Sequence, residues 1–93
     1  MIYLIRCKAN NRVFIGCGYF DWNAALRSFE RGSFRIPAMQ LDWNTYGKDS
    51  FEMEVLEQPW RCNQFKRHRY YVNEFFSYIP DKGYNKLIKK IKD

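Results

Sequence analysis

The sequence has no apolar stretch that approaches the roughly 20 residues needed to cross a bilayer. Its start, Met-Ile-Tyr-Leu-Ile-Arg, lacks the basic-then-apolar order of a secretory signal. Three cysteines, Cys7, Cys17 and Cys62, are odd in number and form no CxxC pair, which argues against a disulfide framework and a structural zinc site. We therefore expect a cytoplasmic protein with free thiols and no membrane partner.

The fraction of apolar residues is high for so short a chain. Of 93 residues, 46% are hydrophobic and 19% are aromatic, and large rings bury much area per residue. A chain of this length can just build a core without disulfides or a metal. We expect one domain, residues 1–93, that folds alone.

Positive charge is concentrated in the last third. The net charge is +6, and residues 61–93 hold nine Lys/Arg and three Asp/Glu, which equals the whole excess. Such a region is typical of proteins that bind nucleic acid or an acidic protein surface, although a merely solvated face is an equally good interpretation. The candidate phosphate contacts are Arg61, Lys66, Arg67, Arg69, Lys86, Lys89, Lys90 and Lys92.

Local patterns predict an α+β arrangement. Two β-branched and aromatic runs flank a turn at residues 8–11, where Asn tolerates a positive φ. Asp21 can cap a helix and Pro37 can begin one. The expected strands are 2–7, 12–17 and 51–57, and the expected helices are 21–31, 37–46, 63–76 and a short basic one over 86–92. These form a three-stranded antiparallel sheet flanked by three helices, plus the short C-terminal basic helix.

The apolar periods also predict which side chains are buried. Alternation in the third strand places Phe51, Met53 and Val55 inward and leaves Glu52 and Glu54 in solvent. In the longest helix the expected core residues are Phe65, Tyr71, Val72 and Phe75.

Several motifs resemble those of one nuclease family. The first two strands carry Met1-Ile2-Tyr3 and Phe14-Ile15-Gly16, and the middle of the chain carries Gly32-Ser33-Phe34, Met39-Gln40, Asp42-Trp43-Asn44, Tyr46-Gly47 and a strand ending in Val55-Leu56-Glu57. Together with the closing Gly83-Tyr84-Asn85, this order resembles the GIY-YIG endonucleases of the phage and intron-homing kind. The resemblance runs from residue 2 to residue 85 and implies the family's fold.

In that family, phosphodiester cleavage uses a divalent cation held by a Glu of the long helix, two motif tyrosines, a helix His and an Arg of the first helix. The resemblance implies that Tyr3 and the closing Asn85 are retained. The other positions are altered: Phe14 replaces the second tyrosine, Ala24 or Asp21 stands for the Arg, Ala25 for the helix His, and Phe34 for a later His. Arg27 is a possible substitute for the phosphate-binding Arg.

The metal position is also altered. His68 stands where the resemblance places the Glu, and a hard cation such as Mg²⁺ prefers oxygen ligands. Glu74, six residues on, lies more than a turn away, so it is a poor substitute. We expect no cofactor, with Mn²⁺, Mg²⁺ or Ni²⁺ bound only if the protein retains activity.

Three hypotheses remain open. The first is a catalytically degenerate domain that binds nucleic acid, DNA rather than RNA, through its basic third, with Tyr70 or Trp22 stacking on bases. The second is an interaction protein that inhibits a host or defence protein. The third is a divergent metal-dependent endonuclease that uses Tyr3, Arg27, His68 and Glu74.

Overall fold

The computed structural model describes residues 1–85. Three strands, β1 (Ile2–Cys7), β2 (Val13–Cys17) and β3 (Phe51–Glu57), form one antiparallel sheet in the order β2-β1-β3. Asn11 closes the β1–β2 turn with a φ of 63°, a conformation that asparagine tolerates better than most residues. The predicted three-stranded antiparallel sheet is confirmed.

Three helices flank this sheet, as predicted: α1 (Trp22–Glu30), α2 (Pro37–Tyr46) and α3 (Gln64–Phe75). Asp21 caps α1, its Oδ1 accepting a hydrogen bond from the Asn23 N–H at 3.0 Å. Short 3₁₀ turns at Lys48–Ser50 and Arg61–Asn63 precede β3 and α3. Within residues 1–85 no helix has the length and apolar character to cross a membrane. The predicted basic helix over residues 86–92 lies outside the described residues.

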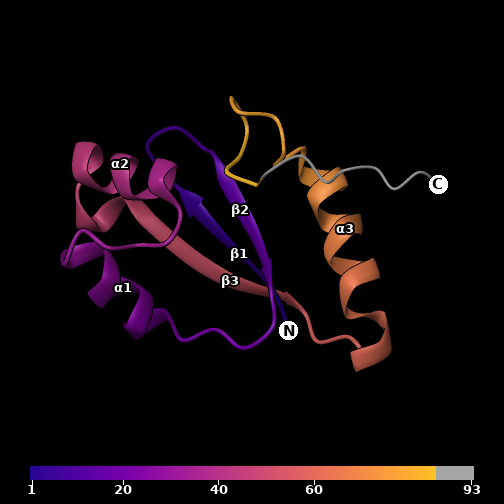
Figure 1. The fold of residues 1–93 in the computed structure, drawn as a ribbon. Coiled ribbons are helices and arrows are strands. Elements are labelled where there is room, and N and C mark those ends of the chain that lie inside the picture. The colour runs from indigo at the N-terminus through magenta and orange to yellow at the C-terminus, as the bar shows by residue number, and fades with distance from the viewer. Residues whose placement is uncertain (86–93) are drawn as a thin grey trace.

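The sheet separates two apolar clusters, because alternate residues of β1 and β2 point to opposite faces. On one face, α1 and α2 pack over a cluster that includes Tyr3, Phe14 and Phe29. On the other, α3 packs through Val72 against residues that include Leu4 and Ile15. Figure 1 shows α1 and α2 on one side of the strands and α3 on the other.

Two predictions of burial are wrong. Val55 is 46% exposed although it pairs with Tyr3 and so keeps the face of Phe51 and Met53, because it lies on the edge strand β3 and outside the apolar cluster that includes Met53. Phe65 is 76% exposed, because the first turn of α3 lies beyond the end of β3 (Figure 1). Phe51 is buried and Met53 half-buried, as expected.

Candidate functional site

Tyr3 and Gly16 lie opposite each other on β1 and β2. A Cβ atom on Gly16 would overlap the Tyr3 ring, so glycine is the residue that lets the ring lie across β2. The buried Tyr3 ring stacks on Phe20, with 4.2 Å between the ring centroids. The glycine of the second tripeptide therefore makes room for the tyrosine of the first.

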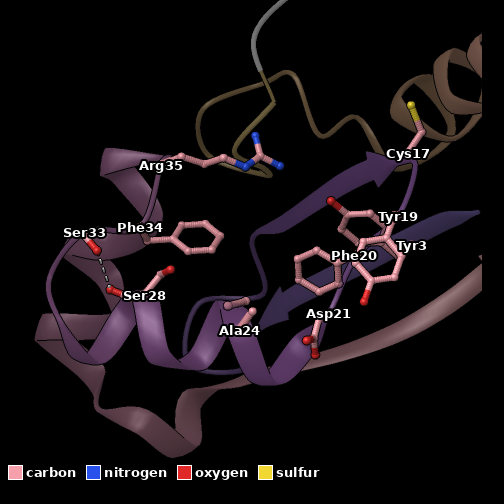
Figure 2. A pocket seen from close by; sticks show the side chains of 11 residues that line it. Tyr3, Cys17, Tyr19, Phe20, Asp21, Ala24, Ser28, Ser33, Phe34 and Arg35 are labelled. Atoms are coloured by element: carbon pink, nitrogen blue, oxygen red, sulfur yellow. Dashed lines mark hydrogen bonds between the residues drawn. The ribbon is translucent and has the colours of Figure 1, made fainter.

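A pocket of about 360 Å³ opens beside Tyr3, between the strands, α1 and the segment that joins α1 to α2 (Figure 2). It is lined by Tyr3, Cys17, Tyr19, Phe20, Asp21, Ala24, Ala25, Ser28, Ser33, Phe34 and Arg35. Ala24, Ala25 and Phe34, which stand where the sequence resemblance places an arginine and two histidines, thus line one space. They contribute methyl groups and a phenyl ring to it.

A second pocket, of about 290 Å³, lies next to the first. Its lining residues are Phe14, Arg35, Ile36, Pro37, Tyr84 and Asn85. Arg35 lines both pockets, and its guanidinium carbon lies 5.7 Å from the centroid of the Phe14 ring. Around Arg35, the two pockets thus bring together residues at six positions that the family resemblance singles out: Tyr3, Phe14, Ala24, Ala25, Phe34 and Asn85.

Arg35 is not among the residues predicted from the sequence. Figure 2 shows it extending from the segment after α1 across the pocket. Gln40 of α2 fixes that segment: its Oε1 accepts from the Phe34 N–H at 2.9 Å, and its Nε2 donates to the Phe29 carbonyl at 3.0 Å. Its position in the sequence could have pointed to it, because Arg35 directly follows Phe34, which stands where the resemblance places a histidine.

The Tyr3 phenol is protonated at neutral pH. Burial raises its pKa above the ordinary value of 10.0, and the positive charge of Arg35 opposes this shift without cancelling it. A neutral phenol donates a hydrogen bond but is not a phenolate nucleophile. Of the charged groups lining the first pocket, Asp21 caps α1 with one oxygen and Arg35 reaches across the opening.

His68 and Asn85 meet at the main chain of Ile15, on the outer edge of β2. The Ile15 N–H donates to Asn85 Oδ1 and the Asn85 amide donates to the Ile15 carbonyl, both at 2.9 Å. His68 Nε2 lies 2.8 Å from the same carbonyl. Because a carbonyl only accepts hydrogen bonds, Nε2 carries the proton and is not a free metal ligand.

The Asp42-Trp43-Asn44 motif holds the fold together. Asp42 Oδ2 accepts hydrogen bonds from the Asn10 amide at 3.0 Å, from Arg12 at 3.1 Å and from the Tyr84 hydroxyl. The Trp43 ring stacks on the buried Phe29, with 4.7 Å between centroids. The hydrogen bonds of Asp42 therefore join α2 to the β1–β2 turn and to the segment after α3.

The remaining predicted site residues do not line these pockets. Arg27 and Glu74 are exposed on α1 and α3. Arg67 is paired with Glu57 at 2.8 Å, which lowers the pKa of that carboxyl, chiefly through the hydrogen bonds that Arg67 donates. Arg61, Lys66 and Arg69 are exposed, whereas Lys86, Lys89, Lys90 and Lys92 lie outside the described residues.

The described residues do not fit a tightly held divalent cation. Within residues 1–85 no group of three or more His, Cys, Asp or Glu side chains is placed to hold a metal ion. His68 donates through Nε2, and Asp21 already accepts a hydrogen bond from the main chain. A hard cation would find one carboxylate in the first pocket.

No protein-family model matches the sequence, and no curated protein does. Two solved structures are similar to the chain. The first is the catalytic domain of intron endonuclease I-TevI, as a point mutant, with a TM-score of 0.80 and 26% identity over 99% of this chain and 97% of that one. The second is the catalytic domain of homing endonuclease I-TevI, with a TM-score of 0.79 and 26% identity over 92% and 96%. The chain therefore has the α+β fold of the I-TevI catalytic domain, and the resemblance to the GIY-YIG endonucleases that its motifs indicate is confirmed.

Proposed function

We propose that this protein binds nucleic acid, DNA more readily than RNA, without cutting it. The observation that carries the proposal is the contact between His68 Nε2 and the Ile15 carbonyl at 2.8 Å. The residue at the family's metal-binding position uses its N–H to hold the edge of the sheet. A nuclease of this kind depends on a metal-held phosphate, so loss of that ligand removes cutting while the fold remains.

The binding surface in this proposal is the outer face of α3, formed by Phe65, Lys66, Arg69 and Tyr70. Phe65 and Arg69 are four residues apart, as are Lys66 and Tyr70, and Lys66 and Arg69 are three apart, so these residues share one side of the helix. Phe65 is 76% exposed and Tyr70 44% exposed. Exposed rings between cations suit a nucleic acid, because the rings stack on bases while the cations contact phosphates.

Two neighbours extend this surface. In the segment before α3, Trp60 is 82% exposed and Arg61 is also exposed. Arg67 acts differently, because its guanidinium lies 4.4 Å from the centroid of the Tyr70 ring and pairs with Glu57. We assign Arg67 the role of orienting Tyr70 and leave phosphate contacts to Arg61, Lys66 and Arg69.

Salt dependence tests the proposal. Fluorescence anisotropy with labelled duplex DNA, single-stranded DNA and RNA, between about 50 and 200 mM salt, should give affinities that fall steeply with salt. The double variant Lys66→Ala/Arg69→Ala should bind more weakly, with a slope of log affinity against log salt smaller by about 2. Lys8→Ala/Lys48→Ala, which removes the same amount of charge from exposed positions in two turns outside α3, is the matched control. Binding that is undetectable or insensitive to salt would contradict the proposal.

A second assay addresses cutting. Supercoiled plasmid incubated with the protein and Mg²⁺, Mn²⁺ or Ni²⁺ should remain supercoiled. Metal-dependent nicking that is lost in His68→Ala and kept in Lys48→Ala would instead establish a divergent endonuclease with His68 in its site.

An inhibitor that docks on a host or defence protein is the second candidate. The exposure of Trp60 and Phe65 favours it, because large exposed rings also anchor protein interfaces. Capture from a nuclease-treated lysate distinguishes the candidates: a partner that survives digestion of nucleic acid and is lost in Trp60→Ser supports an inhibitor. Material that disappears on digestion supports nucleic-acid binding.

A further inference from the structure

The pocket beside Tyr3 has the dimensions of a small-molecule site. Its volume of about 360 Å³ falls within the roughly 300 to 1,000 Å³ of such sites. Figure 2 shows Phe20 and Phe34 on opposite sides of the open space, Arg35 above it and Ala24 of α1 below it. Larger side chains at Ala24 and Ala25 would occupy the same space, because both residues line it.

The aromatic walls of the pocket are held in place. Phe34 stacks on the buried Phe29 with 4.0 Å between centroids and an interplanar angle of 10°. Phe20 stacks on Tyr3 at 4.2 Å and 18°. Tyr19, at the rim, is 91% exposed. Fixed rings with a free ring at the entrance suit a flat aromatic ligand, because stacking then requires little ordering of the protein.

The polar groups favour an anion at one end of the pocket. Arg35 lines the opening and forms no ion pair within residues 1–85, and Gln40 fixes the segment that carries it. Tyr3 supplies a neutral phenol, and Ser28 a hydroxyl group. A guanidinium binds a phosphate through two parallel hydrogen bonds, whereas phenol and hydroxyl groups pair with the polar edge of a base.

We propose that this pocket binds a nucleoside monophosphate unit, with its base against Phe20 and Phe34 and its phosphate on Arg35. The inference rests on the proposed loss of cutting, because the space exists where the resemblance to the family places Ala24 and Ala25 in the positions of a larger arginine and histidine. The unit is either a free mononucleotide or the phosphorylated end of a strand. The pocket lies on the α1–α2 face of the sheet, opposite the outer face of α3.

Calorimetric titration of the purified protein with the common nucleoside 5′-monophosphates tests the inference. At least one of these nucleotides should bind saturably. Arg35→Ala should weaken the affinity for that nucleotide by about tenfold or more, because a charged hydrogen-bonded pair is lost. Arg31→Ala, an exposed arginine four residues away in the same segment, should leave binding unchanged. Ala24→Leu should also abolish binding, because it fills the space while every charge is kept.

Several outcomes would overturn the inference. These are saturable binding of no mononucleotide, inorganic phosphate binding as tightly as the nucleotide, or Ala24→Leu binding normally. The unfolding midpoint of each variant checks that the fold is intact, and an intact Arg35→Ala protein that binds like wild type would also refute it.

The two sources of the unit are separated by competition. A short DNA strand with a 5′-phosphate that displaces the mononucleotide, when the same strand with a 5′-hydroxyl does not, identifies a strand end; displacement by neither identifies a free nucleotide. Duplex binding that persists while no mononucleotide binds would refute nucleotide binding in the pocket but not the proposed function. The variant Lys66→Ala/Arg69→Ala tests the proposed function separately.

Discussion

Asn85 uses both polar atoms of its amide on Ile15, so this retained motif residue has a structural role. Asn85→Ala would leave the Ile15 N–H without that partner in a half-buried place, and we expect a loss of about 1–3 kcal/mol in the free energy of unfolding. Urea denaturation measures it. Asn73→Ala, at an exposed position of α3, is the control and should be neutral or slightly stabilising. An equal effect of both substitutions would refute this role.

Tyr84 gives the protein a specific alkaline sensitivity. Burial, and then the hydrogen bond to Asp42, raise the pKa of Tyr84 well above its ordinary value of 10.0. The unfolded chain therefore ionises first, and the associated stability is complete below about pH 10 and lost as the pH rises above it. Tyr3 and Tyr71 contribute in the same direction. Urea midpoints at pH 8 and pH 11 should differ less in Tyr84→Phe than in wild type; an unchanged difference would count against this account.

At the scale of elements, α2 holds the Arg35 segment through a single side chain. Gln40 is 8% exposed and bonds to the main chain of Phe29, near the end of α1, and of Phe34, directly before Arg35. Gln40→Met keeps the volume and removes these bonds, so we expect a loss of roughly 2 kcal/mol and faster hydrogen exchange at the Phe34 amide. Gln58→Met, at an exposed position after β3, is the control. Unchanged exchange at Phe34 would contradict this role.

The elements themselves were predictable because each has a local signal. Asn11 adopts the positive φ of its turn, Asp21 caps α1 and Pro37 begins α2. The exposure of Val55 and Phe65 was not predictable, because an edge strand and the end of a sheet are properties of paired strands and packed layers. Local periodicity carries no information on either.

At the scale of the whole molecule, the sheet places two proposed sites on opposite faces. Substitutions that share no contact are usually additive, so the two sites should behave independently. We expect Lys66→Ala/Arg69→Ala to leave mononucleotide affinity unchanged and Arg35→Ala to leave the salt slope of duplex binding unchanged, whereas a lost phosphate contact would lower that slope by about one unit. Both are measured by repeating the two titrations on each variant. A loss of both activities in either variant would show one continuous surface.

The candidate site could be predicted from the sequence only in part, because its residues meet only in the folded molecule. The family pattern assigned Tyr3, Ala24 and Ala25 to catalytic positions, and all three line the first pocket. Arg35 was not predicted because it lines two pockets that are adjacent only in the folded protein. The contact of His68 with the Ile15 carbonyl was not predicted for the same reason, since the two residues are 53 positions apart in the sequence.

The contacts of His68 and Asn85 with Ile15 have a consequence for self-association. An unpaired strand edge invites a neighbouring chain to extend the sheet. These side chains, with the main-chain bonds of Val13 to Lys82 and Tyr84, cover that side of β2, so among the described strands the open rim is that of β3. There, Glu52 pairs with Arg6 at 3.6 Å, and the exposed Glu54 would meet the same charge on an antiparallel copy paired about that position, which should disfavour extension of the sheet by a second copy.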